Sequence, residues 1–242
     1  MVVKSQIKEI KSLQQKKCRI QQGMFVVEGV KTVKELLLSE IVAYKVYTTD
    51  LEIFDKAHKS EVILVSANEL KQMSGLKNPN TVLGVFHIPK HELIEYNDWV
   101  VALDNVRDPG NLGTIIRLCD WFGIQHLVCS PNTVDCYNPK VLQATMGSIT
   151  RVNIVYADLI DFFKKAKLPV YGAFMNGVSA YETKIPEKGI LVLGNEANGI
   201  SAEVENMVDA KISIPQFGEI TTESLNVATA ASILLNELRR KS

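Results

Sequence analysis

Residues 99–117 read WVVALDNVRDPGNLGTIIR: an apolar run, a polar loop and the start of a helical pattern. The run at 99–103 is predicted to be a buried strand, because it is apolar at every position. Asn111 stands where an N-cap would begin the helix, and two nearby glycines allow another group to approach the backbone. Arg117 falls in the middle of that helix. A strand, a glycine-containing loop and a helix in this order are typical of a parallel sheet.

The same alternation continues through the rest of the chain. Apolar, β-branched runs predict strands, and apolar residues at a period near 3.6 predict helices. The predicted strands cover 126–129, 151–155, 170–174, 190–193 and 211–214. The predicted helices cover 138–146, 159–167, 201–207 and 224–240. Strands that alternate with helices form a parallel sheet covered on both faces, and such sheets bind ligands beyond the carboxyl ends of their strands.

Two more loops follow predicted strands. LGNEANGI at 193–200 comes directly after an apolar strand, and IPQFGEITTESLN at 214–226 leads into the last helix. Neither is a Walker loop, and the chain has no G-x-G-x-x-G, so a dinucleotide site is unsupported. Each loop has a simpler explanation: an Asn-Gly turn with an exposed glutamate in the first, and Ser224 as a helix cap in the second. Arg117 could likewise pair with Asp120, three residues further along its helix.

The first third of the chain differs in charge from the rest. Residues 1–34 carry eight Lys or Arg against two Glu, a balance of +6, although the whole chain is neutral with 27 charges of each sign. Such a basic surface can bind phosphates, whereas a charge run is more commonly a solvated helix face. Residues 4–17 are predicted to form an exposed helix, and polar residues at 89–97 to mark a domain boundary. Strands are predicted at 25–28, 42–47, 62–65 and 82–87.

The composition is that of an ordinary globular protein. The 242 residues are 46% hydrophobic and 22% charged, which is enough for one or two domains with a core. No apolar run is long enough to span a bilayer, and the lysine-rich N-terminus does not resemble a secretory signal. The four cysteines lack the spacing of a metal or redox site, so free thiols, no metal and a cytoplasmic location are expected.

Together the three loops resemble the SpoU/TrmH family of RNA ribose 2′-O-methyltransferases, within the SPOUT class. The matching residues are NLGTIIR at 111–117, LGNEANG at 193–199, IP at 214–215 and SLNVA at 224–228. The N-terminal stretch is similar to the small substrate-binding domain of the family through R-x-x-x-G-x-F-x-V-E-G, which runs from Arg19 to Gly29. The chain departs from the family pattern in a slightly longer loop at 215–224 and in Gln143, where relatives often carry a basic residue.

The resemblance implies a fold and an activity. The fold would be α/β: a parallel-sheet SPOUT methyltransferase domain with a C-terminal trefoil knot over 97–242, preceded by a small α/β, ribosomal L30e-like domain that binds the RNA substrate over 1–92. The activity would be transfer of a methyl group from S-adenosylmethionine to a ribose 2′-hydroxyl of structured RNA, either rRNA or tRNA. The resemblance also implies a homodimer.

Site residues follow from the same resemblance, position by position. The cofactor-binding residues would be Gly194, Ile214 and Leu225, and the catalytic ones Arg117, Asn111, Glu196, Ser224 and Asn226. Because a guanidinium with a pKa above about 12 is a poor proton acceptor, we expect Arg117 to orient the hydroxyl and stabilise developing negative charge.

Two other functions remain open: a SPOUT methyltransferase that acts on a base, and an RNA-binding protein of this fold without catalysis. The intact set of Asn111, Arg117, Glu196 and Asn226 favours the ribose methyltransferase. The last helix carries an apolar stripe that could face its own sheet or a second subunit, formed by Leu225, Ala228, Ala231, Leu234, Leu235 and Leu238.

Overall fold

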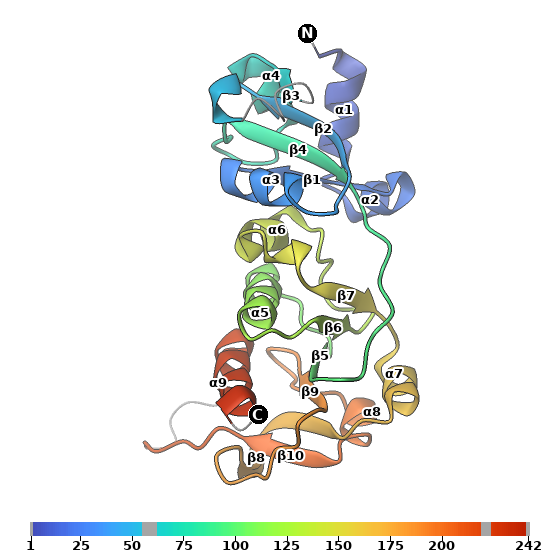
Figure 1. Cartoon of the computed structure of the whole chain (residues 1–242), viewed down its shortest axis with the longest axis vertical. Coiled ribbons are helices and arrows are strands. Elements are labelled where there is room, and N and C mark those ends of the chain that lie inside the picture. The colour runs from blue at the N-terminus through green and yellow to red at the C-terminus, as the bar shows by residue number, and fades with distance from the viewer. Residues whose placement is uncertain (1, 55–61, 219–223, 241–242) are drawn as a thin grey trace. The chain divides into compact units, whose positions relative to one another are not determined.

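The computed structural model describes residues 2–54, 62–218 and 224–240 (Figure 1). The chain divides into two compact units. Unit 1 comprises residues 1–90 and 135–150, and unit 2 comprises residues 91–134 and 151–242. The segment 135–150 therefore belongs to unit 1, although it joins two neighbouring strands of unit 2.

Unit 1 contains a mixed sheet with the strand order β1-β4-β2-β3. β1 and β2 both run antiparallel to β4, and β3 runs parallel to β2. The strands are β1 (Met24–Glu28), β2 (Ala43–Thr48), β3 (Val62–Leu64) and β4 (Val82–His87). The helices are α1 (Lys4–Ser12), α2 (Lys16–Gln22), α3 (Val30–Leu37), α4 (Ala67–Met73) and α6 (Pro139–Thr145), with short 3₁₀ turns at Leu51–Ile53 and Ser148–Thr150.

The N-terminal helix predicted over 4–17 is wrong in two respects. The helix is divided, because α1 ends at Ser12 and α2 begins at Lys16. It is also not exposed throughout: Ile10 and Leu13 are buried in the core that α1 and α4 form with the sheet. The spacing of these apolar residues therefore marked a packed face rather than a free helix.

Unit 2 contains an entirely parallel sheet with the order β10-β8-β9-β5-β6-β7. The strands are β5 (Val100–Leu103), β6 (His126–Cys129), β7 (Asn153–Tyr156), β8 (Val170–Ser179), β9 (Ile190–Leu193) and β10 (Ala210–Ser213). The helices are α5 (Pro109–Trp121), α7 (Leu159–Ala166), α8 (Ala202–Glu205) and α9 (Val227–Arg240). This confirms the predicted α/β class with a parallel sheet.

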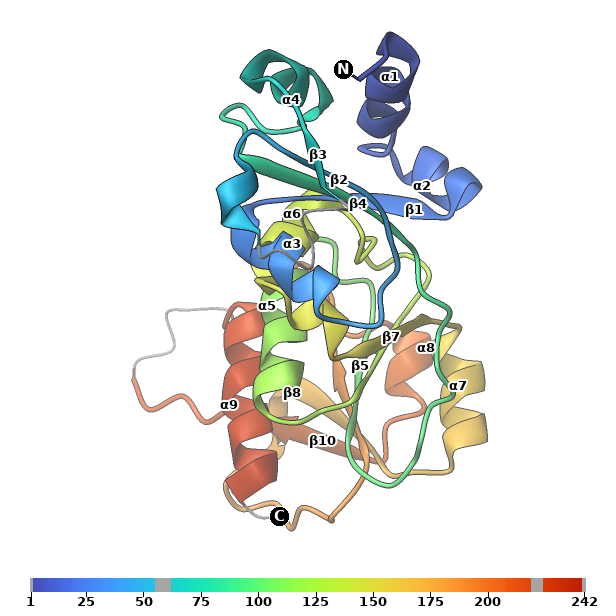
Figure 2. The same ribbon diagram turned by 45° about the horizontal axis from the view of Figure 1, so that its top comes forward.

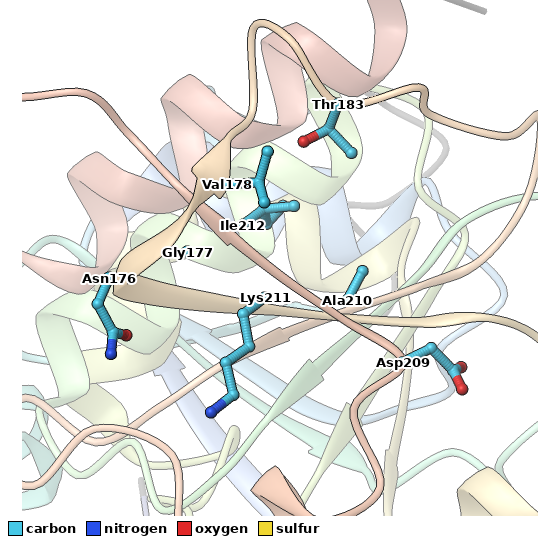
Figure 3. A pocket seen from close by; sticks show the side chains of 8 residues that line it. All are labelled: Asn176, Gly177, Val178, Thr183, Asp209, Ala210, Lys211 and Ile212. Atoms are coloured by element: carbon cyan, nitrogen blue, oxygen red, sulfur yellow. The ribbon is translucent and has the colours of Figure 1, made fainter.

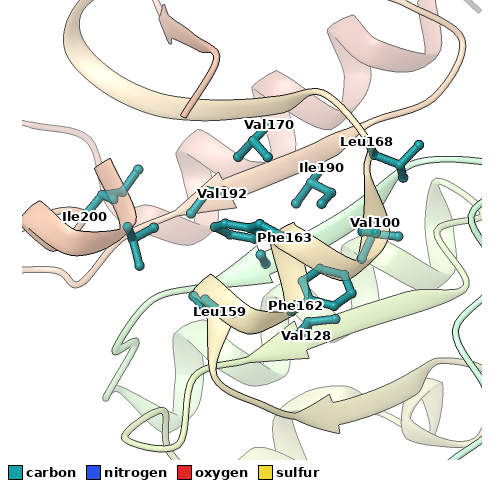
Figure 4. Close-up of a cluster of buried hydrophobic side chains, with 13 residues drawn as sticks. Val100, Val128, Leu159, Phe162, Phe163, Leu168, Val170, Ile190, Val192 and Ile200 are labelled. Carbon is teal, nitrogen blue, oxygen red and sulfur yellow. The ribbon is translucent and has the colours of Figure 1, made fainter. Parts of the chain in front are cut away.

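Helices cover both faces of the unit 2 sheet. α5 and α9 lie side by side on one face, and α7 and α8 lie on the other (Figures 1 and 2). On the second face, Phe162 and Phe163 of α7 pack against strand residues such as Val100 and Val192 (Figure 4). This core explains why the strands are apolar at consecutive positions: their alternate side chains point to opposite faces, and both faces are buried.

Two details of unit 2 differ from the sequence predictions. β8 extends to Ser179 rather than ending near 174, because a bulge lets it resume pairing with β10 at Val178 opposite Ile212. The apolar stripe of α9 faces its own chain: Leu234, Leu235 and the other stripe residues from 228 onward are buried, and only Leu225 is exposed. That stripe is therefore not a surface for a second subunit.

The strand order creates a topological switch point in the sheet of unit 2. From β5 the chain adds β6 and β7 on one side, and then β8, β9 and β10 on the other, so the order reverses between the neighbouring strands β5 and β9. The loops that leave the carboxyl ends of these two strands lie at this switch point, which is where ligands of such sheets bind.

Candidate active site

The loop after β5 and the loop after β9 are joined by hydrogen bonds. The Asp104 backbone N–H donates to the Leu193 carbonyl at 2.9 Å, which continues the sheet. The Asp104 carboxylate is 2% exposed, and its Oδ2 accepts from the Ser201 backbone N–H at 2.7 Å. Asn105, which has a left-handed φ of 58°, presents its carbonyl to the side chain of Asn195 at 2.7 Å. The loops at the carboxyl ends of β5 and β9 are therefore held to one another.

Asn195 is the centre of the second loop. Its amide nitrogen donates to Asn105 and, at 3.3 Å, to Glu196 Oε2. Its oxygen accepts from the backbone N–H groups of Ala197 and Asn198 at 3.0 and 3.1 Å. Both ends of the side chain are thus used, which holds the loop in one conformation.

Gly194 satisfies a steric requirement of the same loop. The backbone of Asn195 pairs with that of Gly199 in both directions, at 2.8 and 2.9 Å, and this folds the loop back on itself. A Cβ atom on Gly194 would lie 2.2 Å from the carbonyl carbon of Gly199. Only glycine allows this close approach.

Glu196 connects the two loops from the outside. Its carboxylate accepts from the Asn111 side chain at 2.9 Å and from the backbone N–H groups of Asp108 and Arg107 at 3.2 and 3.3 Å. Partial burial alone would raise the pKa of Glu196, but these hydrogen bonds outweigh it, and the pKa lies below its ordinary value. Glu196 is therefore a fixed, charged acceptor rather than a proton donor at neutral pH.

Asn111 connects Glu196 to the residue that precedes the last helix. Its side-chain oxygen accepts from the Asn226 amide at 2.9 Å, while its nitrogen donates to Glu196. Asn226 in turn uses its oxygen to cap α9, accepting from the backbone N–H groups of Ala228 and Thr229 at 2.9 and 3.2 Å. The structure thus brings together three of the predicted residues, Glu196, Asn111 and Asn226, as a connected network.

Two capping predictions are wrong. The N-cap of α5 is Asp108, whose Oδ1 accepts from the Asn111 backbone N–H at 2.8 Å, and Pro109 occupies the first helical position. Asn111 lies one turn further on, so its side chain is free to join the network. Likewise, Asn226 rather than Ser224 caps α9, so the capping explanation for Ser224 does not hold.

Arg117 lies two turns into α5 with its side chain exposed. The alternative reading, an ion pair with Asp120, is not observed, because Asp120 binds Arg151 at 3.0 Å instead. Within the described ranges Arg117 has no hydrogen-bond or ion-pair partner. A guanidinium that supports no fold contact is available for an anionic or polar ligand.

The remaining predicted residues form no hydrogen bond with the network among the described residues. Ile214 follows β10 and is half-buried, and Leu225 is exposed directly before Asn226. Ser224 is exposed and its hydroxyl makes no hydrogen bond within residues 2–54, 62–218 and 224–240. Residues 219–223 of the third loop lie outside the described part of the chain.

Sequence reasoning missed Asp104, Asn105 and Asn195, which bind one loop to the other. For Asp104 and Asn195 the sequence contains a signal that could have identified them. Asp104 is a carboxylate directly after an apolar strand, where a buried acceptor for a neighbouring backbone is a natural role. Asn195 lies in the motif LGNEANG at 193–199, next to the predicted site residues Gly194 and Glu196.

The N-terminal motif residues are structural. Arg19 is 2% exposed; it donates to the carbonyls of Leu13 and Gln14 at 2.8 and 2.9 Å and forms an ion pair with Asp135. Glu28 accepts from the Ser74 hydroxyl at 2.5 Å and from a neighbouring backbone N–H. Arg19 therefore does not contribute to the exposed basic surface that its charge suggested.

A separate pocket of about 420 Å³ lies between the bulged part of β8 and β10 (Figure 3). Its charged groups already have partners: Lys211 is paired with Glu205, and the Asp209 carboxylate accepts from the Val170 backbone N–H at 2.8 Å. None of the predicted site residues lines it. We therefore assign the pocket to the geometry of the bulge and not to the active site. No helix of the described ranges is both long and apolar enough to cross a bilayer.

Comparison with known proteins agrees with this geometry. Residues 98–236 match the SpoU rRNA methylase family, and residues 4–84 match the MRM3-like substrate-binding domain. The 23S rRNA (guanosine(2553)-2′-O)-methyltransferase RlmP of Bacillus subtilis is 32% identical over 239 residues, covering 96% of this chain and 95% of the relative.

Solved structures are similar over the whole length. A protein of the TrmH family from Porphyromonas gingivalis is 38% identical and has a TM-score of 0.90, with all of both chains covered. An AdoMet-bound rRNA methyltransferase from Sinorhizobium meliloti is 30% identical and has a TM-score of 0.87, with 99% of this chain and 96% of that chain covered.

Proposed function

The chain belongs to the SpoU rRNA methylase family, and we propose that it transfers the methyl group of S-adenosylmethionine to a ribose 2′-hydroxyl of ribosomal RNA. The observation that carries the proposal is the network of Glu196, Asn111 and Asn226 at the carboxyl ends of β5 and β9. Arg117 of the same helix as Asn111 is exposed and has no hydrogen-bond or ion-pair partner among the described residues. Ribosomal RNA is the substrate named for the Bacillus subtilis relative that spans nearly the whole chain.

The loops after β9 and β10 fit the cofactor. Gly194 keeps the loop after β9 narrow, and the half-buried Ile214 and exposed Leu225 offer apolar surface from the two segments on either side of 219–223. An apolar wall next to exposed loop backbone suits an adenosyl group, which has a flat ring and hydrogen-bonding edges. We therefore assign Gly194, Ile214 and Leu225 to cofactor binding, in loops arranged as a trefoil knot.

The bound cofactor supplies a methyl group on a positively charged sulfur, so the protein has to align the hydroxyl and assist loss of its proton. In our proposal Arg117 binds the 2′-oxygen and the adjacent phosphate and stabilises the negative charge that develops on that oxygen. Asn111, Asn226 and Ser224 position the ribose. Glu196, charged at neutral pH, fixes the orientation of the Asn111 amide.

The larger organisation is part of the same proposal. We assign residues 1–92 to RNA binding and residues 97–242 to methyl transfer, in a cytoplasmic protein. We further propose a homodimer through α5 and α9, because Trp121 at the end of α5 is 83% exposed. A tryptophan left in water at the side of two packed helices is a strong candidate for the centre of an interface.

Labelled S-adenosylmethionine tests the activity directly. The protein is incubated with separated rRNA and tRNA, and the labelled RNA is hydrolysed in alkali. We expect label in rRNA at a linkage that resists alkali, because a methylated 2′-oxygen cannot attack its phosphate. Label on a mononucleotide released by alkali would instead show base methylation, and an absence of label in both pools would indicate a protein that binds RNA without catalysis.

A further inference from the structure

Tyr44 of unit 1 lies in a β-bulge. On either side of it, Ala43 pairs with Phe86 and Lys45 pairs with Val85, so Tyr44 is an extra residue without a partner on β4. The rest of β2 is conventional, and Val46, Tyr47 and Thr48 are buried. Tyr44 is 43% exposed. Because bulges redirect a side chain and are frequent beside functional sites, this tyrosine is presented to solvent rather than used in the core.

The groups next to Tyr44 are an imidazole and an ammonium. The rings of Tyr44 and His87 meet edge to face, with centroids 5.8 Å apart and planes at 85°. Lys45 Nζ lies 5.0 Å from the centroid of the Tyr44 ring. His87 is exposed at the end of β4. Two exposed rings from the neighbouring strands β2 and β4, together with the Lys45 ammonium, form a small surface. We call Tyr44, His87 and Lys45 the aromatic platform.

Further positive charge lies at the same end of the sheet. α2 is followed by Gly23, whose carbonyl accepts from the Ile88 backbone N–H at 2.8 Å, directly after His87. α2 carries the exposed Lys16 and Lys17 and belongs to the segment with a charge of +6. This charge would attract a polyanion toward the platform.

We propose that the aromatic platform binds an unpaired nucleobase of the RNA substrate. A base would stack on the exposed Tyr44 ring, which His87 contacts edge to face, and the Lys45 ammonium would contact the phosphate of the same or the next nucleotide. Sequence-specific RNA binding commonly uses bases that are splayed out of loops or bulges and stacked on Tyr or His, whereas a duplex offers no free base face. The inference rests on the proposed function, because it assigns one part of the RNA to one part of unit 1.

Binding of fluorescent RNA tests the platform. The probes are a single-stranded oligoadenylate and a hairpin duplex of equal length, and the variants are Tyr44→Ala and Tyr44→Phe. Since loss of one base–aromatic stack weakens binding by about 5- to 100-fold, Tyr44→Ala should raise the Kd for oligoadenylate by that factor and leave the duplex nearly unaffected. Tyr44→Phe should bind oligoadenylate like the wild type. Lys45→Ala should reduce the salt dependence by about 0.7 log units per log unit of salt.

A matched control removes exposed apolar surface elsewhere on unit 1. Leu38 at the end of α3 is 77% exposed, so Leu38→Ala should change neither Kd. In methylation of rRNA, Tyr44→Ala should raise the KM for RNA with kcat and cofactor affinity unchanged, which a general loss of structure would not do. Equal binding by Tyr44→Ala and the wild type would overturn the inference, as would an equal loss in Leu38→Ala. Oligoadenylate binding is measured without methyl transfer, so failure of the proposed function is recognised separately, as absent methylation by the wild type.

Discussion

Replacing Asn195 with aspartate tests whether its amide holds the loops after β5 and β9 together. The side chains have the same shape, so Asn195→Asp creates no cavity. It removes the donor to the Asn105 carbonyl, at 2.7 Å, and places a carboxylate 3.3 Å from Glu196 Oε2. An acceptor left without its donor costs about 1–3 kcal/mol, and repulsion between partly exposed charges adds up to about 1 kcal/mol. We expect a total loss of about 1–4 kcal/mol in the free energy of unfolding at pH 7.5.

The loss should be reversed by acid. Two adjacent carboxylates raise the pKa of one of them, and the protonated group can donate a hydrogen bond again. The difference from the wild type should therefore shrink as the pH falls from about 7.5 to about 5. The stability contributed by Glu196 is constant over this range in the wild type. Its folded-state pKa is lowered, so this contribution is fully present above the ordinary glutamate pKa of about 4.3 and is lost as the pH falls through the lower folded-state pKa.

The assay is urea denaturation across this pH range, together with the Kd for S-adenosylmethionine measured by calorimetry. Asn198→Asp is the control, since Asn198 lies in the same loop with an exposed side chain. It adds the same charge without touching Asn105, and it should change stability by less than about 0.5 kcal/mol. If Asn195→Asp is as stable as Asn198→Asp, or if its deficit is the same at every pH, the Asn195 amide does not hold the loops.

Three further predictions concern single side chains. Arg117→Ala should lower the rate of single-turnover methyl transfer by about 10²–10³, as for loss of one preorganised charge-stabilising donor, with cofactor affinity unchanged. Arg117→Lys should also be slow, because lysine lacks the planar two-pronged geometry of the guanidinium. Near-normal transfer by Arg117→Ala would remove this residue from the mechanism. Light scattering should give about twice the 26.9 kDa chain mass for the wild type and the single mass for Trp121→Glu, and a wild-type monomer would contradict the interface. Arg19→Ala should destabilise unit 1 by about 3–5 kcal/mol because it leaves Asp135 without its buried partner, whereas replacing Lys16 and Lys17 with alanine should spare stability and flatten the salt dependence of RNA binding. If Arg19→Ala and the double lysine variant have the same effect on stability and on the salt dependence of RNA binding, this distinction between a buried and an exposed basic residue is wrong.

The sequence was most informative where local pattern and burial coincide. β9 was predicted with its observed bounds at 190–193, because an apolar β-branched run between polar loops has few other conformations. Local sequence determines helix starts less well: Asp108 before Pro109 and Asn111 are both capping signals, and the structure uses Asp108. Both residue types satisfy a helix N-terminus, and only the fold decides between them.

Contacts between distant positions could not be predicted from local pattern. Asn111 meets a partner 85 residues away in Glu196 and another 115 residues away in Asn226. Their assignment to one site came from a family resemblance, whereas the structure supplies the hydrogen bonds. The grouping of 135–150 with unit 1 is of the same kind, since the ion pair of Arg19 with Asp135 spans 116 positions. No periodicity within either segment contains that information.

Asn226 serves the network with Asn111 and the cap of the last helix with the same side chain, and this has a consequence for the order in which the protein matures during its synthesis. A ribosome that has made residues 99–200 has already synthesised β5 and β9 together with Asn111 and Glu196. The third member of the network is added only when the chain reaches residue 226, and its oxygen becomes fixed when the next residues wind into α9. Completion of the network is therefore coupled to formation of the final helix, and a nascent chain that ends before Asn226 cannot form the complete network.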